Sequence, residues 1–259
     1  MEGSAGVMAL VLGQTVAGAA ALLWVTPLWN EVKRGYFKLT GAILVVLALA
    51  WWRSSDAGLV AGSDAGLWSV RFALATTVLT LAWIALLFAR HQGAARVLGL
   101  VDVPVAAAGL VAMAGTARQA EVLAMFQLFA GAAFLGAVLD GLLLGHWYLT
   151  DRGLSRGPIN RNTVVMLVAV AVEAAAVVSG GFGRVGVSAE FNPLLTAGAL
   201  APWIALGMVG TTALIAVLAK AALKGSRASA VQSATGFFYL AVVTAFTAEV
   251  AVKVRFLPR

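Results

Sequence analysis

Apolar runs of about 20 residues follow one another along almost the whole of this sequence. As an α-helix, a run of that length crosses the roughly 30 Å of hydrocarbon in a bilayer, at about 1.5 Å per residue. Hydrophobic types make up 61% of the 259 residues and charged types only 11%, whereas about 25% charged residues is usual for a soluble domain. The sequence therefore predicts an integral membrane protein.

The runs predict an all-α polytopic membrane protein, folded as a bundle of about eight transmembrane helices. Backbone polar groups in hydrocarbon must be paired, and continuous apolar runs of this length favour helices over barrel strands. We expect one integral membrane domain over 1–259, without room for a separate soluble domain. The predicted spans are 6–29, 35–52, 67–90, 95–116, 120–150, 162–182, 195–223 and 229–254.

Basic residues predict the orientation of the bundle. They concentrate in the connections after the first, third, fifth and seventh runs, and the positive-inside rule places such connections in the cytoplasm. Both termini are then outside, in a bacterial-type inner membrane. The basic loops would meet anionic lipid head groups, so the net charge of +7 does not call for nucleic acid as a partner. These residues are Lys33, Arg34, Lys38, Arg90, Arg96, Arg152, Arg156, Arg161, Lys224 and Arg227.

Polar side chains within the apolar runs are candidates for function, because an ionisable group in hydrocarbon is costly unless it is paired or faces water. Gln14, Arg71 and Glu249 fall in the outer halves of the first, third and eighth spans, and Glu173 falls near the middle of the sixth. The alternatives are structural. Arg71 could extend to the surface, and Glu249 could form an ion pair with Lys253, four residues on.

A second group of polar residues lies toward the predicted cytoplasmic side. Asp102, Asp140 and His146 fall in the inner halves of their spans, and His91 follows the third span. These four could form one polar cluster on a quinone or proton pathway. Asp140 and His146 are six positions apart, or about 240° around a helix, so they do not share a face. The structural alternatives are aspartates that fix helix register and histidines that lie in a loop or at the interface.

Small residues repeat every four positions beside His146. The repeat consists of Ala133, Ala137, Gly141 and Gly145. A stripe of this kind lets a neighbouring helix approach closely, so we expect a helix contact along it.

Motifs that would name an activity are missing, and no catalytic residue is assigned. There is no phosphate-binding glycine loop, no HExxH metal site and no GxSxG nucleophile turn. Cysteine is absent, which excludes thiolate-held iron–sulfur clusters within this chain. With 2 histidines, a single haem between His91 and His146 is the most that the chain could hold, and we expect neither haem, a metal nor a covalently bound cofactor. We also find no internal repeat of the kind that transporters show.

Two stretches resemble a known family. "LVLGQTVAGAA" and "AVVTAFTAEVAVKVRFL" are similar to the first and last helices of the membrane-anchor subunits of DMSO-reductase-type respiratory enzymes, with Gln14 and Glu249 as the matching residues. The resemblance implies eight helices, both termini outside, no haem, and exchange of electrons and protons between quinone and an iron–sulfur partner subunit. A third subunit of those enzymes holds a molybdenum cofactor. Where those anchors carry a histidine beyond their second helix, this chain reads "WWRSSDAG".

The expected function is that of a membrane subunit that anchors a respiratory or electron-transfer complex and interacts with quinone or quinol, without a redox centre of its own. Apolar helices and buried carboxylates supply a lipid-like pocket and proton acceptors, and quinol oxidation needs both. Its partners would be lipids and other subunits, including an iron–sulfur protein. Two alternatives stay open: a proton- or ion-coupled transporter, which uses the same features, and a passive scaffold.

Overall fold

The fold of this chain is a bundle of long helices. The computed structural model describes residues 1–151, 153–182, 200–225 and 229–256. Within this part of the chain, 8 helices are long and apolar enough to cross a membrane, which confirms the predicted all-α, multi-pass membrane fold. They are α1 Gly3–Val25, α3 Arg34–Ala57, α4 Asp64–Phe88, α5 Gln92–Ala114, α6 Glu121–Thr150, α7 Gly157–Ser179, α9 Leu200–Ala222 and α10 Ser229–Lys253.

The helix boundaries differ from the predicted spans by a few residues, and proline explains two of the differences. The first predicted span ran to 29, but α1 ends at Val25 and the chain turns at Pro27 into the short α2, Leu28–Glu31. The sixth span was expected to start at 162, but α7 starts at Gly157 with Pro158 in its first turn. Proline is favoured there because it lacks the N–H that the first turn leaves unpaired. The part of the seventh span before Leu200 lies outside the described residues.

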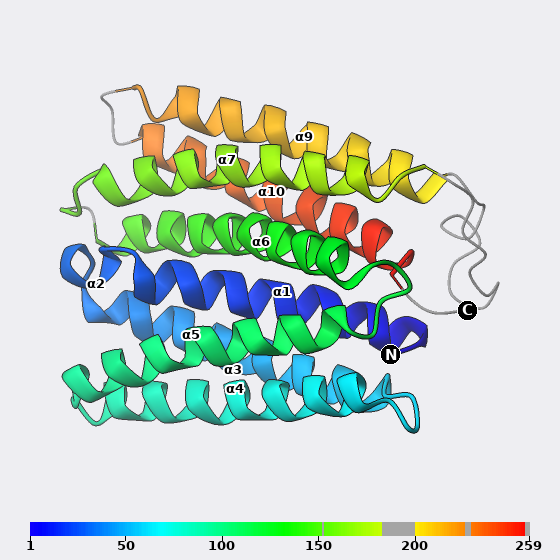
Figure 1. Ribbon diagram of the computed structural model, residues 1–259. Helices are drawn as coiled ribbons and strands as arrows, with labels where there is room; N and C mark the ends of the chain where they lie inside the picture. The colour runs from blue at the N-terminus through cyan, green and yellow to red at the C-terminus, as the bar shows by residue number, and fades with distance from the viewer. Residues whose placement is uncertain (152, 183–199, 226–228, 257–259) are drawn as a thin grey trace.

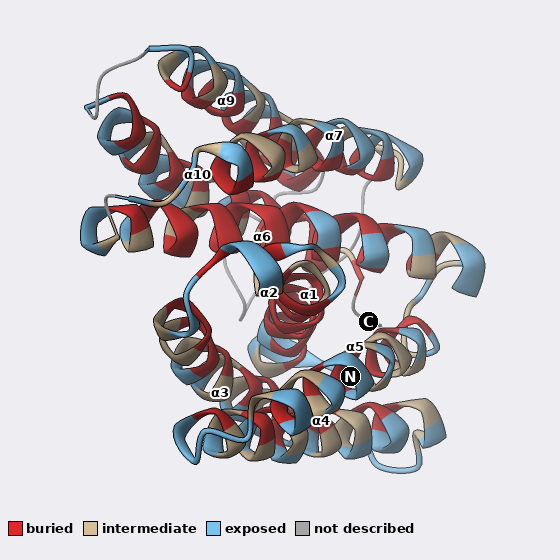
Figure 2. Cartoon of the chain, turned by 90° about the vertical axis from the view of Figure 1, so that its left-hand side faces the viewer, coloured by how far each residue is buried: buried red, intermediate tan, exposed pale blue. Residues whose placement is uncertain are grey.

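The membrane helices form two four-helix units that lie side by side (Figures 1 and 2). In the first unit α1, α3, α4 and α5 each pack against the next, and α5 returns to α1. In the second unit α6, α7, α9 and α10 do the same. Both units therefore have the same helix order, and α1 and α6 begin at the same end of the bundle (Figure 1). The absence of an internal sequence repeat of the kind that transporters show stays a prediction, because helix order alone does not test it.

The two units meet where α1 packs against α6, and glycines make this contact close. A Cβ atom at Gly18 would lie 1.8 Å from the carbonyl oxygen of Ala132. A Cβ atom at Gly136 would lie 2.4 Å from the carbonyl carbon of Gly18. Small residues let helix backbones approach in this way in membranes. The backbones of α1 and α6 are therefore in contact at the centre of the molecule.

The two ends of the bundle differ in charge. We call the end at which α1 begins and α10 finishes the terminal end (Figure 1). At the opposite end, Lys33 pairs with Asp151 at 3.0 Å, and Arg161 pairs with Glu31 at 2.6 Å. We call it the basic end, and the positive-inside rule predicts that it faces the cytoplasm.

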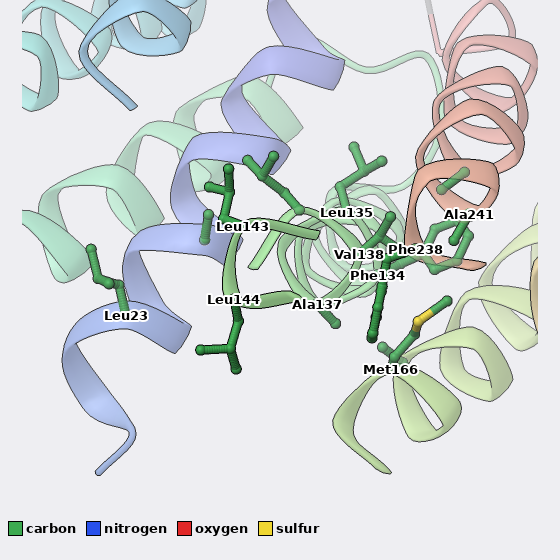
Figure 3. Close-up of a cluster of buried hydrophobic side chains, with 14 of the residues drawn as sticks. Leu23, Phe134, Leu135, Ala137, Val138, Leu143, Leu144, Met166, Phe238 and Ala241 are labelled. Carbon is green, nitrogen blue, oxygen red and sulfur yellow. The ribbon is translucent and has the colours of Figure 1, made fainter. Parts of the chain in front are cut away.

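Between the two ends, buried apolar side chains of α1, α6, α7 and α10 pack together (Figure 3). We call this part of the core the apolar layer. All of its members are apolar. The layer consists of Leu23, Phe134, Leu135, Val138, Met166, Phe238 and Ala241.

Candidate functional site

Four polar side chains and the main-chain carbonyl group of Gln127 lie together inside the bundle, between its middle and its terminal end. We call them the terminal cluster, and each side chain is buried. The cluster draws on both four-helix units, because α1 contributes to it together with α6, α7 and α10. Its members are Gln14, Gln127, Glu173, Glu249 and Lys253.

An ion pair lies within the terminal cluster. Lys253 Nζ is 3.2 Å from the Glu249 carboxylate, one turn earlier in α10, and both side chains are fully buried. The same ammonium group donates a hydrogen bond of 3.3 Å to the main-chain carbonyl oxygen of Gln127. The structural alternative that paired Glu249 with Lys253 is therefore confirmed.

Glu173 brings a second carboxylate into the cluster. Its side chain is fully buried in α7, and neither carboxylate oxygen has a hydrogen-bond partner among the described residues. It lies close enough to Glu249 and Lys253 to interact with both electrostatically. Buried polar groups are nearly always hydrogen-bonded, so an exception of this kind needs a chemical reason.

Gln14 packs against the ion pair from α1. Its Nε2 atom donates to the carbonyl oxygens of Leu128, at 3.1 Å, and Gln127, at 3.4 Å. A Cβ atom at Gly131 would lie 1.8 Å from Gln14 Nε2 and 2.8 Å from both carboxylate oxygens of Glu249. The absence of a side chain at Gly131 is therefore what lets the Gln14 amide and the Glu249 carboxylate share this space.

A cavity of about 240 Å³ adjoins the terminal cluster. Gln127 belongs to both: it lines the cavity, its Nε2 atom donates to the carbonyl oxygen of Ala176 at 3.1 Å, and its Oε1 atom accepts from Gln119. The cavity is thus adjacent to the part of the bundle that holds the buried carboxylates. Its lining residues are Arg118, Gln119, Gln127, Val177, Gly180, Pro202, Val252, Arg255 and Phe256.

Arg255 gives the cavity a fixed positive charge. Its guanidinium group donates hydrogen bonds to the carbonyl oxygens of Gly180, at 3.2 Å, and Gly181. Burial lowers the pKa of the Arg255 guanidinium from its ordinary value, but an arginine stays protonated in proteins at any ordinary pH. Neither Gln127 nor Arg255 was predicted from the sequence to be a functional residue. Gln127 could have been found by the criterion that selected Gln14, a polar side chain inside an apolar run.

A separate polar site lies toward the basic end. Asp140 is buried in α6 and accepts a hydrogen bond from the hydroxyl group of Tyr36 in α3. Arg161 of α7 is near enough to interact electrostatically with Asp140, and it makes two hydrogen bonds to Glu31, at 3.1 and 2.6 Å. A cavity of about 10 Å³, which is on the order of one water molecule, touches both Asp140 and Arg161.

The four residues predicted to share one cytoplasmic-side cluster do not come together. Asp102 is buried in α5 and accepts a hydrogen bond of 2.9 Å from Thr80, while its Oδ1 atom has no partner among the described residues. Asp140 lies in the second four-helix unit and has its own partners, Tyr36 and Arg161. The residues His91 and His146 are exposed. These residues were predicted to lie at similar depths in the membrane, but similar depth does not imply contact. Depth does not determine which neighbouring helix a side chain faces.

Arg71 fits its structural alternative. The residue is exposed on α4, and its guanidinium group lies 5.0 Å from the centre of the ring of Trp68, three residues earlier in the chain. An exposed cation over an aromatic face is common near the ends of helices. Arg71 is therefore not part of the terminal cluster.

The predicted small-residue stripe forms helix contacts along most of its length. The carbonyl oxygen of Ala137 accepts a hydrogen bond of 2.9 Å from Asn162 in α7. Gly141 and Gly145 face side chains of α10, where an added Cβ atom would lie 2.1 Å from Phe238 and 2.6 Å from Thr235 respectively. The remaining member of the stripe, residue 133, is exposed.

Comparisons with protein-family models, with curated proteins and with solved structures gave no match. No family is therefore assigned to this chain.

Proposed function

We propose that this chain is a membrane subunit of an electron-transfer complex and that it interacts with quinone or quinol at its terminal end. One observation carries the proposal: the cavity of about 240 Å³ adjoins a cluster with two buried carboxylates. Oxidation of a quinol releases two electrons and two protons. A quinol site therefore needs room for the ring and a proton acceptor close by.

The lining of the cavity suits a quinone head group. Val177, Val252 and Phe256 offer an apolar wall for the ring, while Arg118 and Gln119 carry N–H donors. A quinone carbonyl oxygen accepts hydrogen bonds, and small-molecule sites commonly combine an apolar wall with a few polar groups that fix orientation.

The electrons would pass to a partner subunit. The chain has no cysteine to ligate an iron–sulfur cluster, and both of its histidines are exposed. If the predicted orientation holds, the terminal end faces outside, so a partner that receives electrons from this cavity would dock there. The partner's chemical class, an iron–sulfur protein, is what the resemblance to the anchor subunits implies.

Quinone binding to the full chain in lipid nanodiscs tests the proposal. The probe is a short-tailed ubiquinone analogue, and the readout is quenching of tryptophan fluorescence. Arg118→Gln removes a donor from the cavity, and Arg53→Gln is the matched control, because Arg53 is an exposed arginine in α3. We expect Arg118→Gln to weaken binding about tenfold, the factor for about 1.4 kcal/mol, and Arg53→Gln to leave it unchanged. Equal affinities in both variants would refute the assignment of the cavity.

A proton-coupled transporter is the second candidate, and the two four-helix units with the same helix order favour it. Internal repeats with a substrate site between or within them are typical of secondary transporters. Vesicles that contain the chain alone separate the two functions. A transporter would dissipate an imposed proton gradient when its substrate is added, whereas we expect a subunit of an electron-transfer complex to leave the gradient intact.

A further inference from the structure

We propose that the terminal cluster is a binding site for a single proton, which Glu173 and Glu249 share, and that Lys253 limits the number of protons to one. The site does not depend on quinone as the ligand of the neighbouring cavity. It would serve a quinol-oxidising subunit as the first proton acceptor and a transporter as the coupling site.

The charges of the cluster explain why it would bind one proton. Glu173 and Glu249 are acidic and Lys253 is basic, and all three side chains are fully buried. Among the described residues the neighbouring helices add no charge: α1 contributes Gln14, α6 contributes Gln127, and the charged residue of α9, Lys220, donates a hydrogen bond to Asn160 near the basic end. With every group ionised, the cluster would carry one uncompensated negative charge. A buried charge without a partner is strongly destabilising, so the cluster requires one more positive charge.

Arg255 does not supply this charge. It is the nearest further basic residue along α10 and its extension, and its guanidinium group is held by the carbonyl oxygens of Gly180 and Gly181. Those bonds keep it at the end of α7. The groups that interact electrostatically with Glu173 are Glu249 and Lys253.

The geometry favours a proton over a metal ion. A hard cation takes most of its ligands from oxygen atoms, but a positively charged ammonium group already lies beside the Glu249 carboxylate. Lys253 Nζ lies at 3.2 Å. A Cβ atom added at Gly131 would lie 1.8 Å from Gln14 Nε2 and 2.8 Å from each carboxylate oxygen of Glu249. The Gln14 amide group therefore packs beside this carboxylate as well. A proton needs no coordination sphere of oxygen atoms. It is covalently bound to one carboxyl group, which donates it in a hydrogen bond to the other.

Exchange of this proton would take place with the terminal end. The main-chain carbonyl oxygen of Gln127 belongs to the cluster, and Gln127 also lines the cavity. The proposed route therefore leads from the two carboxylates past Gln127 to the cavity, and water or a bound quinol there is the donor from which the proton comes.

Infrared spectroscopy of the full chain in lipid tests the proposal, because a protonated carboxyl group has its own C=O stretch, which shifts in D₂O. We expect one such band from the cluster near neutral pH. Glu173→Gln leaves the neutral pair Glu249–Lys253, and Glu249→Gln leaves Glu173 with Lys253, so each substitution should remove the band. Lys253→Met removes the only cation, so both carboxyl groups should be protonated and the band should double.

Three results would overturn the proposal. A band that survives Glu249→Gln belongs to Glu173 alone and is not shared. If the wild-type spectrum lacks the band, the cluster does not hold a proton. If the band appears only when sodium is replaced by choline, an alkali ion takes the place of the proton. Asp102→Asn is the control, because it removes a buried carboxyl group of the other unit and should leave the cluster's band unchanged. None of these infrared measurements uses quinone. If the quinone-binding test fails, the proposal of a shared proton is therefore not affected.

Discussion

Replacing Gly18 by alanine should separate the two four-helix units at their closest contact. The added Cβ atom would lie 1.8 Å from the carbonyl oxygen of Ala132, 2.6 Å from its carbonyl carbon and 3.1 Å from the Cα atom of Gly136. All three are backbone atoms, so no side chain can rotate away. To restore ordinary contact, α1 and α6 would have to move apart by roughly 1.6 Å.

The expected loss of stability follows from two opposing effects. Overpacking typically costs about 1–3 kcal/mol, and the upper value applies here because rigid backbone lies behind the contact. Glycine to alanine within a helix otherwise stabilises it by about 0.5–1 kcal/mol. Gly210 provides the matched control, since it lies inside α9 and an added Cβ atom would meet nothing within 4 Å. We expect Gly18→Ala to be less stable than Gly210→Ala by about 3 kcal/mol.

Reversible unfolding of the purified chain in mixed micelles measures this difference as a free energy of unfolding. Gly210→Ala should unfold at the same or a higher fraction of denaturing detergent than the wild type, and Gly18→Ala at a clearly lower one. If both variants unfold together, then α1 and α6 do not touch through their backbones, and the packing of the two units described above is wrong.

Two further predictions concern orientation and Asp140. The chain has no cysteine, so single cysteines introduced at Ser4 and Ser155, both exposed and near opposite ends, should be labelled from opposite sides of the membrane. Labelling from the same side would contradict the bundle's orientation. Asp140 accepts its hydrogen bond from neutral Tyr36, so Asp140→Asn should change the free energy of unfolding by less than about 1 kcal/mol, while Tyr36→Phe leaves a buried acceptor unpaired at a cost of about 1–3 kcal/mol. The same detergent titration measures both, and equal losses would refute this role for Tyr36.

The existence and approximate bounds of the helices could be predicted from the sequence, because length and hydropathy alone decide whether a segment can span a bilayer. The neighbours of each helix could not. An apolar run shows little contrast between a face that meets lipid and a face that meets another helix, so Asp102 and Asp140 were expected together although they belong to different units. Contact between α1 and α6 depends on Gly18 and Gly136, and nothing in the sequence pairs these two glycines.

Part of the terminal cluster was predictable for a different reason. Gln14, Glu173 and Glu249 stand out because polar side chains are rare in apolar runs, and the structure brings Gln14 and Glu249 to the same point above Gly131. Lys253 was expected only as a structural partner of Glu249, and its contact with the main chain of Gln127 could not be foreseen. Contacts that join side chains to the backbone of another helix leave no mark in the sequence.

The apolar layer bears on how the buried carboxylates could work together. From Gly131, beside the terminal cluster, to Asp140 is nine residues along α6, or about 13 Å. Phe134, Leu135 and Val138 lie between them along α6 and are buried in the same apolar cluster as Phe238 of α10 (Figure 3). A proton does not cross packed hydrocarbon without water, so protons held by the cluster and protons held by Asp140 would exchange with opposite sides of the membrane. A subunit that oxidises quinol at the terminal end needs this separation, since a leak across it would dissipate the gradient that the reaction helps to build. A transporter would instead have to open this layer, in which Phe134 and Phe238 are fully buried, in every cycle.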